Sequence, residues 1–515
     1  MYGRHACVTY ACATLLSGCA AGPNYHTPHL ALPPQYATAA PAAPAAGAGA
    51  VSVDLTQWWR ALNDPQLDSL IERAVSGNPD LLIALERLQA ARTFEAAVVG
   101  TVLPAGEAAG GAGRGSGSDL SRGRASQALR SADNGAGWQH INLVAGFDAV
   151  WELDIFGKYR REIEVARYDE QASLAARNAV LVAVVADVAR AYVDLRGLQV
   201  RAAVLDADIA VLRESLRIVS IRYQRGITNE LDETLATREL ATLEAQAAPL
   251  AAQVQAAQFT IATLLGRYPE ELTQELSAKT LVPAVPGAMA PGAPLELLRR
   301  RADIRQAERE LAAANARIGI ATANLFPSVA LSAAIGYQRQ DQGSAPVLGE
   351  HIWSAGPSLV WPLLDFGALD AQVEIADLQT RALLLNYKKT IQGAVREVDS
   401  NLALYGAEQQ SLTQLDTALM ASQRAVTLAN ERYQRGLTDF LNVVDAERAQ
   451  YDIQQQYTNA QVGLAQQFIE LYRSLGGGWE NYQQLPAIHR PEPAIIAAFQ
   501  RVLSRSTALK DPAPP

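Results

Sequence analysis

The chain has 515 residues, enough for several ordinary domains. Its formal net charge of −9 provides no basic surface, which argues against a nucleic-acid partner. The six histidines are scattered without a pair at metal-binding spacing, and no phosphate-binding loop is followed by a helix. The sequence therefore indicates neither a metal site, nor a cofactor, nor an enzyme.

The first 18 residues have the pattern of a secretory signal peptide, with basic residues before a short apolar segment. Residues 16–19, Leu-Ser-Gly-Cys, resemble the cleavage box of bacterial lipoproteins. We therefore expect cleavage before Cys19 and a covalent lipid (diacylglycerol and palmitoyl) on this cysteine. The absence of Asp at Ala20 favours sorting to the outer membrane. A plain signal peptide with an incidental cysteine is the alternative.

An acylated tether is predicted over 19–60, because the segment is rich in proline and alanine. A helix is expected from Pro65 to about Val102, where Leu103-Pro104 breaks it. A counterpart is expected from about Leu295 to Leu325 and breaks at Phe326-Pro327.

The chain builds one long helix-like run twice. The string Arg-Tyr-Gln-Arg-Gly occurs at 222–226 and again at 432–436, 210 positions later. Trp151…Phe156-Gly157 recurs at the same offset as Trp361…Phe366-Gly367. Matching ends at one spacing indicate an internal duplication. The two long helices are predicted over 157–225 and 367–435.

The first long run carries a regular apolar seam. From Leu181 to Tyr223 apolar residues recur in twelve steps over 42 residues, a mean spacing of 3.5. This is the period of a left-handed coiled coil. The second run keeps the seam except at Glu408 and Ser422. At roughly 1.5 Å per residue each helix is on the order of 100 Å long, which predicts an extended helical bundle or tube.

Between Pro104 and Trp151, and again between Pro327 and Trp361, the spacing of apolar residues changes from that of a helix to that of a strand. Apolar residues alternate with small or polar ones from Leu143 to Ile155, from Val329 to Tyr337 and from Trp353 to Leu363. Strands of this length and pattern match those of outer-membrane barrels, with a small soluble sandwich as the alternative. No stretch of eighteen apolar residues follows the N-terminal region, so we expect any membrane crossing to use strands.

Two β-hairpins are thus predicted, over 103–156 and 327–364. The first strand, from Pro104 to about Gly111, is weak because glycine and alanine dominate it.

Each long helix is followed by a tight turn and a returning helix. Gly226 and Gly436 can adopt the left-handed conformation that ends a helix. Thr228 and Thr438 can cap the next helices, which are predicted over 228–265 and 438–475. The predicted repeats therefore span 61–266 and 295–475, with a linker at 267–294 and a tail at 476–515.

Several strings match a known family. They are Cys19-Ala20-Ala21-Gly22-Pro23-Asn24-Tyr25, Trp58-Trp59, Asp64-Pro65, Asp303-Ile304, Phe326-Pro327, Gly356-Pro357-Ser358, Trp361-Pro362 and the two Arg-Tyr-Gln-Arg-Gly turns. On these residues the chain resembles the TolC/OprM-like outer-membrane efflux channels. The closest resemblance is to the NodT-type lipoproteins that serve resistance-nodulation-division (RND) pumps. Ala302 departs from the family's usual proline before the aspartate.

The resemblance implies a homotrimer in the outer membrane of a Gram-negative bacterium. Each protomer would give four strands to a shared twelve-stranded β-barrel and helices to an α-helical periplasmic barrel. The implied function is a passive exit duct for drugs or other small toxic compounds, working with a periplasmic adaptor and an inner-membrane RND pump. The alternatives are a same-fold duct for secreted protein or metal ions, and a periplasmic coiled-coil lipoprotein scaffold without a pore.

The resemblance also assigns roles to the turns. It implies a periplasmic gate at Leu441 and Asp445, which are four residues apart and so share a helix face. Tyr433 is a further gate candidate, although its seam position also fits simple packing. The turn residues are the expected docking tips for the adaptor, and structural capping is the alternative for the glycines and threonines. These tips are Arg225, Gly226, Ile227, Thr228, Arg435, Gly436, Leu437 and Thr438.

Overall fold

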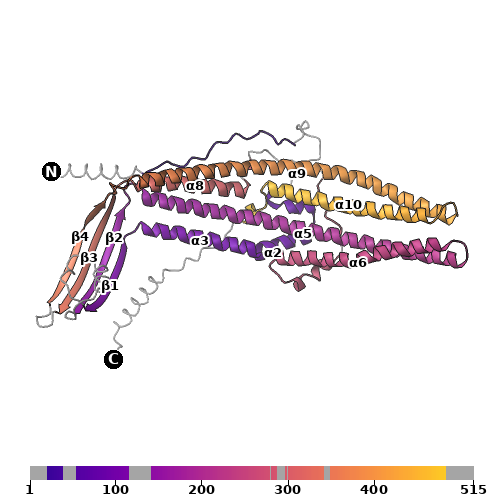
Figure 1. Cartoon of the computed structure of the whole chain (residues 1–515), viewed down its shortest axis with the longest axis horizontal. Coiled ribbons are helices and arrows are strands. Elements are labelled where there is room, and N and C mark those ends of the chain that lie inside the picture. The colour runs from indigo at the N-terminus through magenta and orange to yellow at the C-terminus, as the bar shows by residue number, and fades with distance from the viewer. Residues whose placement is uncertain are drawn as a thin grey trace, which may run out of the picture.

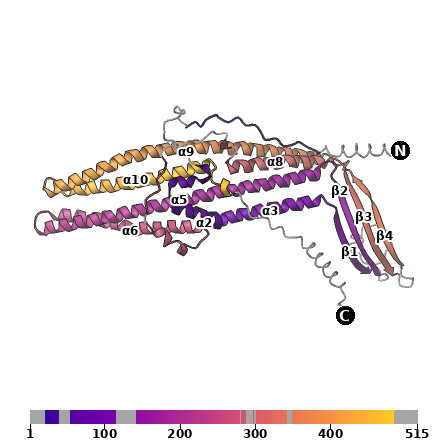
Figure 2. The same cartoon turned by 180° about the vertical axis from the view of Figure 1, so that it is seen from behind.

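The computed structural model describes residues 20–38, 54–114, 141–278, 280–286, 296–297, 300–341 and 348–482. The predicted signal peptide, Cys19 and most of the predicted tail lie outside these residues. An elongated helical body carries a four-stranded sheet at one end and two helical turns at the other (Figure 1). The view from behind shows the same arrangement of long helices running side by side (Figure 2).

The two predicted hairpins form one sheet. Its strands are β1 (Ala105–Arg114), β2 (Ile141–Leu153), β3 (Ser328–Asp341) and β4 (Leu348–Val360). They pair antiparallel in the order β1-β2-β3-β4, so the hairpins of the two repeats join through β2 and β3. Among the described residues, the outer edges of β1 and β4 have no partner strand. Unpaired backbone groups at both edges leave this sheet incomplete as an isolated unit.

The glycine-rich first strand is real, and it reaches Arg114 rather than about Gly111. An aromatic ring on the neighbouring strand replaces the missing side chains. A Cβ atom added at Gly106 would lie 2.8 Å from the ring of Phe147 on β2. The glycine therefore leaves room for a large side chain that covers the strand.

The two long helices have equal length. They are α5 (Lys158–Gln224) and α9 (Ala368–Gln434), each 67 residues. Residue Leu181 of the predicted seam is fully buried in α5, and so are Val188 and Tyr192. In α9 the seam is covered more sparsely, at positions such as Ile391 and Val398. Helix α5 is therefore the central element of this chain and α9 lies at its flank (Figure 1).

One 18-residue window of α5 is apolar enough to cross a membrane by length and composition. An uninterrupted run of eighteen apolar residues is still absent from this helix, because Asp187, Arg190 and Asp194 interrupt its most apolar part. Within the structure, 61% of that window is buried against the rest of the chain. Its apolar character is accounted for by packing as the core helix.

The helix predicted from Pro65 to Val102 is in fact two helices, α2 (Pro65–Gly77) and α3 (Pro79–Thr101). The break lies at Asn78, whose backbone is extended and whose side chain accepts a hydrogen bond from the Leu81 N–H at 3.1 Å. Pro79 has no N–H and its ring disfavours a helical residue before it. The prediction overlooked Asn78-Pro79 as a second helix start after Asp64-Pro65.

The two returning helices begin two or three residues later than the sequence suggested. They are α6 (Glu230–Leu264) and α10 (Leu441–Ser474). The helix predicted from about Leu295 is interrupted at Arg301, which adopts extended backbone angles; residues 296, 297 and 300 are helical before it, and α8 (Ala302–Ala323) follows it.

Four short 3-10 helices were not predicted. The first, η1 (Leu55–Leu62), begins inside the predicted tether. Two others, η3 (Pro269–Glu271) and η4 (Glu275–Ser277), lie in the predicted linker, and η5 (Glu480–Tyr482) lies in the predicted tail.

Two equivalent polar joints close the repeats. Asn78 donates from Nδ2 to the Leu264 carbonyl at the end of α6, at 2.8 Å. In the second repeat Arg301 donates from Nη1 to the Ser474 carbonyl at the end of α10, at 2.9 Å. Each joint satisfies a carbonyl that the helix itself leaves free at its C-terminus.

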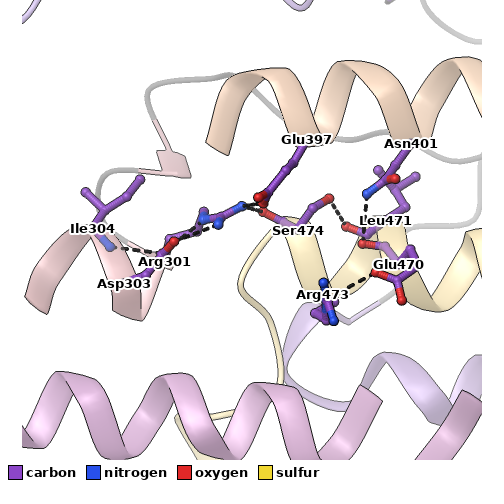
Figure 3. Close-up of polar contacts among 9 residues, drawn as sticks. All are labelled: Arg301, Asp303, Ile304, Glu397, Asn401, Glu470, Leu471, Arg473 and Ser474. Atoms are coloured by element: carbon purple, nitrogen blue, oxygen red, sulfur yellow. Dashed lines mark hydrogen bonds and ion pairs between the residues drawn. The ribbon is translucent and has the colours of Figure 1, made fainter. Parts of the chain in front are cut away.

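The second joint also carries charge (Figure 3). The Arg301 guanidinium lies 2.7 Å from carboxylate oxygens of both Asp303 and Glu397. Arg301 is only 9% exposed, so it links α8, α9 and the end of α10 from a nearly dry position. The bidentate geometry toward Asp303 suits an arginine and no other cation.

The middle of the body holds the largest aromatic cluster. Trp58 of η1 stacks on Tyr472 with ring centroids 5.8 Å apart, and Phe468 of α10 packs against both rings. Trp58 is 1% exposed and Trp59 is 3% exposed. The segment before α2 is thus fixed onto the end of the second repeat, which ties the two repeats together.

Replacement of Arg301 by alanine is expected to lower the stability of the body by about 2 kcal/mol, because it strands the Ser474 carbonyl and two carboxylates. Thermal unfolding followed by circular dichroism measures this loss. Arg300→Ala is the matched control, because its pair with Glu296 spans 3.8 Å at the surface and such pairs contribute little. Equal unfolding temperatures for the two variants would contradict the role given to Arg301.

Candidate functional site

The two helical turns have the same backbone. Gly226 and Gly436 both have φ of 69°, in the left-handed region, as the sequence predicted. The Gly226 N–H donates to the Tyr223 carbonyl at 2.8 Å, and the Gly436 N–H to the Tyr433 carbonyl at 2.9 Å. This hydrogen-bonding pattern ends each long helix and reverses the chain.

Exposed cationic and apolar side chains lie on both turns. Arg225 and Arg435 are exposed, and Ile227 and Leu437 are 60% and 63% exposed. Nothing in the described part of the chain covers them. Two similar, solvent-facing apolar tips are a feature of surfaces that receive a partner.

The threonines do not cap the returning helices as predicted. Asn229 caps α6 by accepting from the Asp232 N–H at 3.1 Å, and the Thr228 hydroxyl instead donates to the Asp232 carboxylate. In the second turn the Thr438 hydroxyl accepts from Asn442 at 2.7 Å. Asn was the stronger capping signal at the first turn, and at the second no side chain caps the helix.

The second turn carries a buried aromatic contact that the first lacks. Tyr433 is 7% exposed and its ring centroid lies 5.2 Å from that of Phe440, which is 2% exposed. The Arg222 guanidinium of α5 lies 4.7 Å from the Tyr433 ring centroid. The equivalent Tyr223 is 38% exposed. In this conformation Tyr433 therefore packs between the two hairpins, with its pKa raised by burial.

The remaining gate candidates lie on the surface of this chain. Leu441 is 48% exposed and Asp445 is exposed one turn further along α10. At the equivalent positions of the first repeat, Leu231 is 61% exposed and Leu235 is partly buried. A carboxylate at this position is therefore present on only one of the two returning helices, although α6 carries Glu230, Asp232 and Glu233 in its first turn.

Sequence reasoning missed Arg222 and Phe440. Arg222 belongs to the same five-residue string as Arg432, so the local sequence could not tell which arginine covers a ring. A signal did exist for Phe440, because its equivalent in the first repeat is Glu230. An aromatic residue in place of an acidic one at a helix start indicates a buried contact.

At the other end of the body, the N-terminal segment lies at the foot of the sheet. Arg161 of α5 donates to the Ala21 and Gly22 carbonyls at 3.1 and 3.2 Å and to the Asn24 side chain at 2.9 Å. Ala20 approaches Gly157 so closely that a Cβ there would lie 2.7 Å from its Cα. The residue after Cys19 is thus fixed where the strands meet the helices.

Two tryptophans mark the same level. Trp151 donates from Nε1 to the Val102 carbonyl at 2.9 Å, and Trp361 donates to the Leu325 carbonyl at 3.2 Å. Both rings remain partly exposed, at 40% and 52%. The sheet above them also exposes Trp353, at 78%. Aromatic rings that expose an apolar body and bond through one polar atom suit a membrane interface.

The described part of the chain contains no group of three or more His, Cys, Asp or Glu side chains that could hold a metal ion.

Replacement of Arg222 by alanine is expected to loosen the second turn, because a cation over an aromatic ring contributes about 1 kcal/mol. Amide hydrogen exchange in segment 436–445 should then quicken about fivefold. Arg432→Ala, at the equivalent exposed position, is the control and should leave exchange unchanged. If the two variants behave alike, the contact does not hold the turn.

The chain matches the model of one protein family, described as outer membrane efflux protein, over residues 70–267 and 293–477. It is 28% identical to nodulation protein T of Rhizobium leguminosarum bv. trifolii, over 90% of this chain and 96% of that protein. It is 30% identical to the toluene efflux pump outer membrane protein TtgC of Pseudomonas putida, over 92% and 95% of the two chains.

Solved structures agree. The outer-membrane channel OprN superposes with a TM-score of 0.77 at 34% identity, over 90% of this chain and 100% of that one. The open state of the MtrE outer membrane channel of Neisseria gonorrhoeae gives 0.73 at 25% identity, over 91% and 100%. With a sheet at one end, two equivalent turns at the other and this match along its length, the chain belongs to the outer membrane efflux protein family and has the fold of its channels.

Proposed function

We propose that three copies of this chain form the outer-membrane exit duct of a tripartite RND-type efflux system for drugs or other small toxic compounds. The observation that carries the proposal is the open four-stranded sheet on a duplicated helical body. Among the described residues its two edge strands lack partners, and in a membrane every backbone polar group must be paired. Three copies would close twelve strands into one barrel without edges.

The flanks of the helical body support a ring of copies. Helix α3 exposes Phe94 at 60% and Ile83 at 49%, and α9 exposes Leu385 at 65% and Leu378 at 53%. The two helices lie on opposite sides of α5 in both views (Figures 1 and 2). Two different apolar faces on opposite flanks suit a head-to-tail contact, which closes into a ring when the rotation fits. Two repeats per chain would then give the tube six similar units.

The transported class is supported by the relatives. One is the toluene efflux pump outer membrane protein TtgC, and another is the pyoverdine export outer membrane protein OpmQ of Pseudomonas aeruginosa, at 30% identity. Small organic compounds are therefore favoured over secreted proteins. The exposed turns at Arg225–Thr228 and Arg435–Thr438 are the proposed docking tips for a periplasmic adaptor, since no described residue covers their apolar side chains.

The proposed gate is a ring of three Leu441 and three Asp445 side chains at the periplasmic end. It is supported by the exposure of both residues on one face of α10 and by the absence of an acidic equivalent in the first repeat. Three carboxylates at one level would favour cations and repel one another when the tips approach. Tyr433 would act on this gate indirectly, because it packs between Phe440, at the start of α10, and Arg222 of the first hairpin.

Single-channel recording in a planar bilayer tests the duct, with the mass of the purified protein as the check on its trimeric state. The wild type is expected to form a trimer with small, cation-preferring currents. Absence of any current, even after the tips are loosened by Arg222→Ala, would favour the scaffold without a pore.

The gate has its own test in the same recording. Asp445→Ala should raise conductance and reduce the cation-to-anion permeability ratio about twofold, because charges about 8 Å apart in water interact by about 0.5 kcal/mol. Leu235→Ala, at the equivalent position of the first repeat, is the matched control for helix truncation. A ratio that Asp445→Ala leaves at the wild-type value would remove Asp445 from the gate.

Lipidation of Cys19 remains part of the proposal. It is supported by the seat of Ala20–Asn24 at the foot of the sheet, where an attached lipid would reach the membrane. Intact mass of the wild type should exceed that of the cleaved chain by the diacylglycerol and the amide-linked acyl group, and Cys19→Ser should lose both. An unmodified wild-type mass would show a plain secretory signal instead.

A further inference from the structure

Above the tips, the first hairpin (α5 and α6) and the second hairpin (α9 and α10) are joined by polar contacts. Arg448 of α10 pairs with Glu239 of α6 at 2.9 Å. The Tyr451 hydroxyl donates to Gln246 of α6 at 3.0 Å, and Arg201 of α5 donates to Gln455 at 2.8 Å. Helix α10 is therefore fastened along its length to the opposite hairpin.

A cavity of about 200 Å³ interrupts this seam. Its lining includes Asp208 on α5 and Glu447 on α10, together with Leu212, Leu243 and Val426. Two acidic residues from opposite hairpins thus line one partly open cavity with apolar neighbours.

These carboxyl groups lack the partners that buried charges require. The Oδ2 atom of Asp208 and both carboxyl oxygens of Glu447 are buried and make no hydrogen bond of ordinary length among the described residues, although the Asn430 amide lies near enough to favour the ionised form of Glu447. Arg448, which also lines the cavity, pairs with Glu239. An ionised carboxylate in such a place carries a large desolvation penalty, which the neutral acid avoids.

The other charged or titratable groups around the cavity come from three helices, with Asn430 contributed by α9. They are Arg201 of α5, Arg238 and Glu239 of α6, and Arg448, Tyr451 and Asp452 of α10. Arg238 lies 3.6 Å from the same Glu239 that holds Arg448. Arg238 and Arg448 are thus directed at Glu239 and Arg201 at Gln455, and the negative charge of Asp208 acts on Glu447 across the cavity.

Burial raises the pKa of Asp208 to about 6. Burial also raises the pKa of Glu447 to about 7; the Asn430 amide opposes this, and the negative charges of Asp208 and Glu239 add to it. The packed arrangement therefore binds protons more tightly than separated hairpins do. Its stabilisation is complete below about pH 4, where free carboxyls are protonated, and is lost as the pH rises through about 6 to 7.

We propose that Asp208 and Glu447 form a proton-controlled clasp between the two hairpins. When the pair is protonated, α10 stays docked on the first hairpin. When both carboxyls ionise, their repulsion across the cavity loosens α10 and favours separation of the tips. The inference rests on the proposed function only in taking tip separation as the opening movement.

The acidic pair does not recur at the equivalent positions of the two repeats. At the equivalent positions, 210 residues away, Asp208 corresponds to Ala418, Glu447 to Thr237 and Glu239 to Ala449. This acidic pair is therefore confined to the contact between the first hairpin and the proposed gate helix. Acidic residues that served only to keep the surface soluble would be expected at the equivalent positions of both repeats.

Hydrogen exchange of the full-length purified protein tests the clasp. The readout is protection of segment 436–450 at pH 5.5 and pH 8, corrected for the intrinsic effect of pH on exchange. We expect wild-type opening to be about tenfold more frequent at pH 8, since each unit of pKa difference is worth a factor of ten and partial exposure reduces the full effect. No current is measured, so a protein that fails to conduct still tests the clasp.

Variants make the test specific. Asp208→Asn with Glu447→Gln should keep segment 436–450 protected at both pH values, and Glu447→Gln alone should lose most of the pH response. Asp416→Asn, an exposed acid of α9, is the matched control and should respond like the wild type. Equal wild-type protection at the two pH values, or a pH response that survives in the double variant, would overturn the proposal.

Discussion

The structure depends on lateral burial of one long helix. A helix of 67 residues gains little from its ends and must find neighbours along its sides. Helix α5 does so within the chain, because α2, α3, α6, α8 and α10 cover successive stretches of it. Helix α9 has the same length, but in the described part of the chain its extensive helix contacts are with α8 and α10, and it leaves Leu378 and Leu385 in solvent. This half-covered copy of the long helix is the physical basis for proposing that further copies of the chain pack against it.

The duplication gives the two repeats equal backbones and unequal side chains. The turns at Gly226 and Gly436 share their φ angle and hydrogen bonds, because the same five residues precede both. The environments then diverge at one position, where Phe440 replaces Glu230. The Phe440 ring packs against Tyr433, which is buried, and Arg222 of the first repeat lies over the Tyr433 ring. The two hairpins therefore have similar backbones, but at the second turn the side chains of the second hairpin pack against the first.

The same contrast appears in the joints that close the repeats. Asn78 and Arg301 meet equivalent helix ends, yet one is a neutral amide and the other a buried cation with two carboxylates. The arginine side chain contacts α9 through Glu397 as well as α10, whereas the asparagine side chain bonds Leu264 of α6 and the start of α3. The second repeat is thus held at its base by charge and along α10 by polar contacts. Polar contacts between helices can be broken at lower cost than an apolar core, which suits the repeat proposed to move.

The sequence by itself determined the architecture, because the relevant signals are periodic and occur twice. The 3.5-residue seam, the alternating strands, the repeated turn and the family strings led to the long helices, the hairpins and the channel fold. Only the tertiary structure decided where identical residues differ, as with Arg222 and Arg432, since burial depends on neighbours that lie distant in sequence. The structure also decided between competing local signals for where helices start and which residue caps them. Asn78-Pro79 divides a predicted helix, and Asn229 caps where Thr228 was expected. Asp208 and Glu447 occupy ordinary polar positions in the sequence, and only the packing of the two hairpins brings them to one cavity.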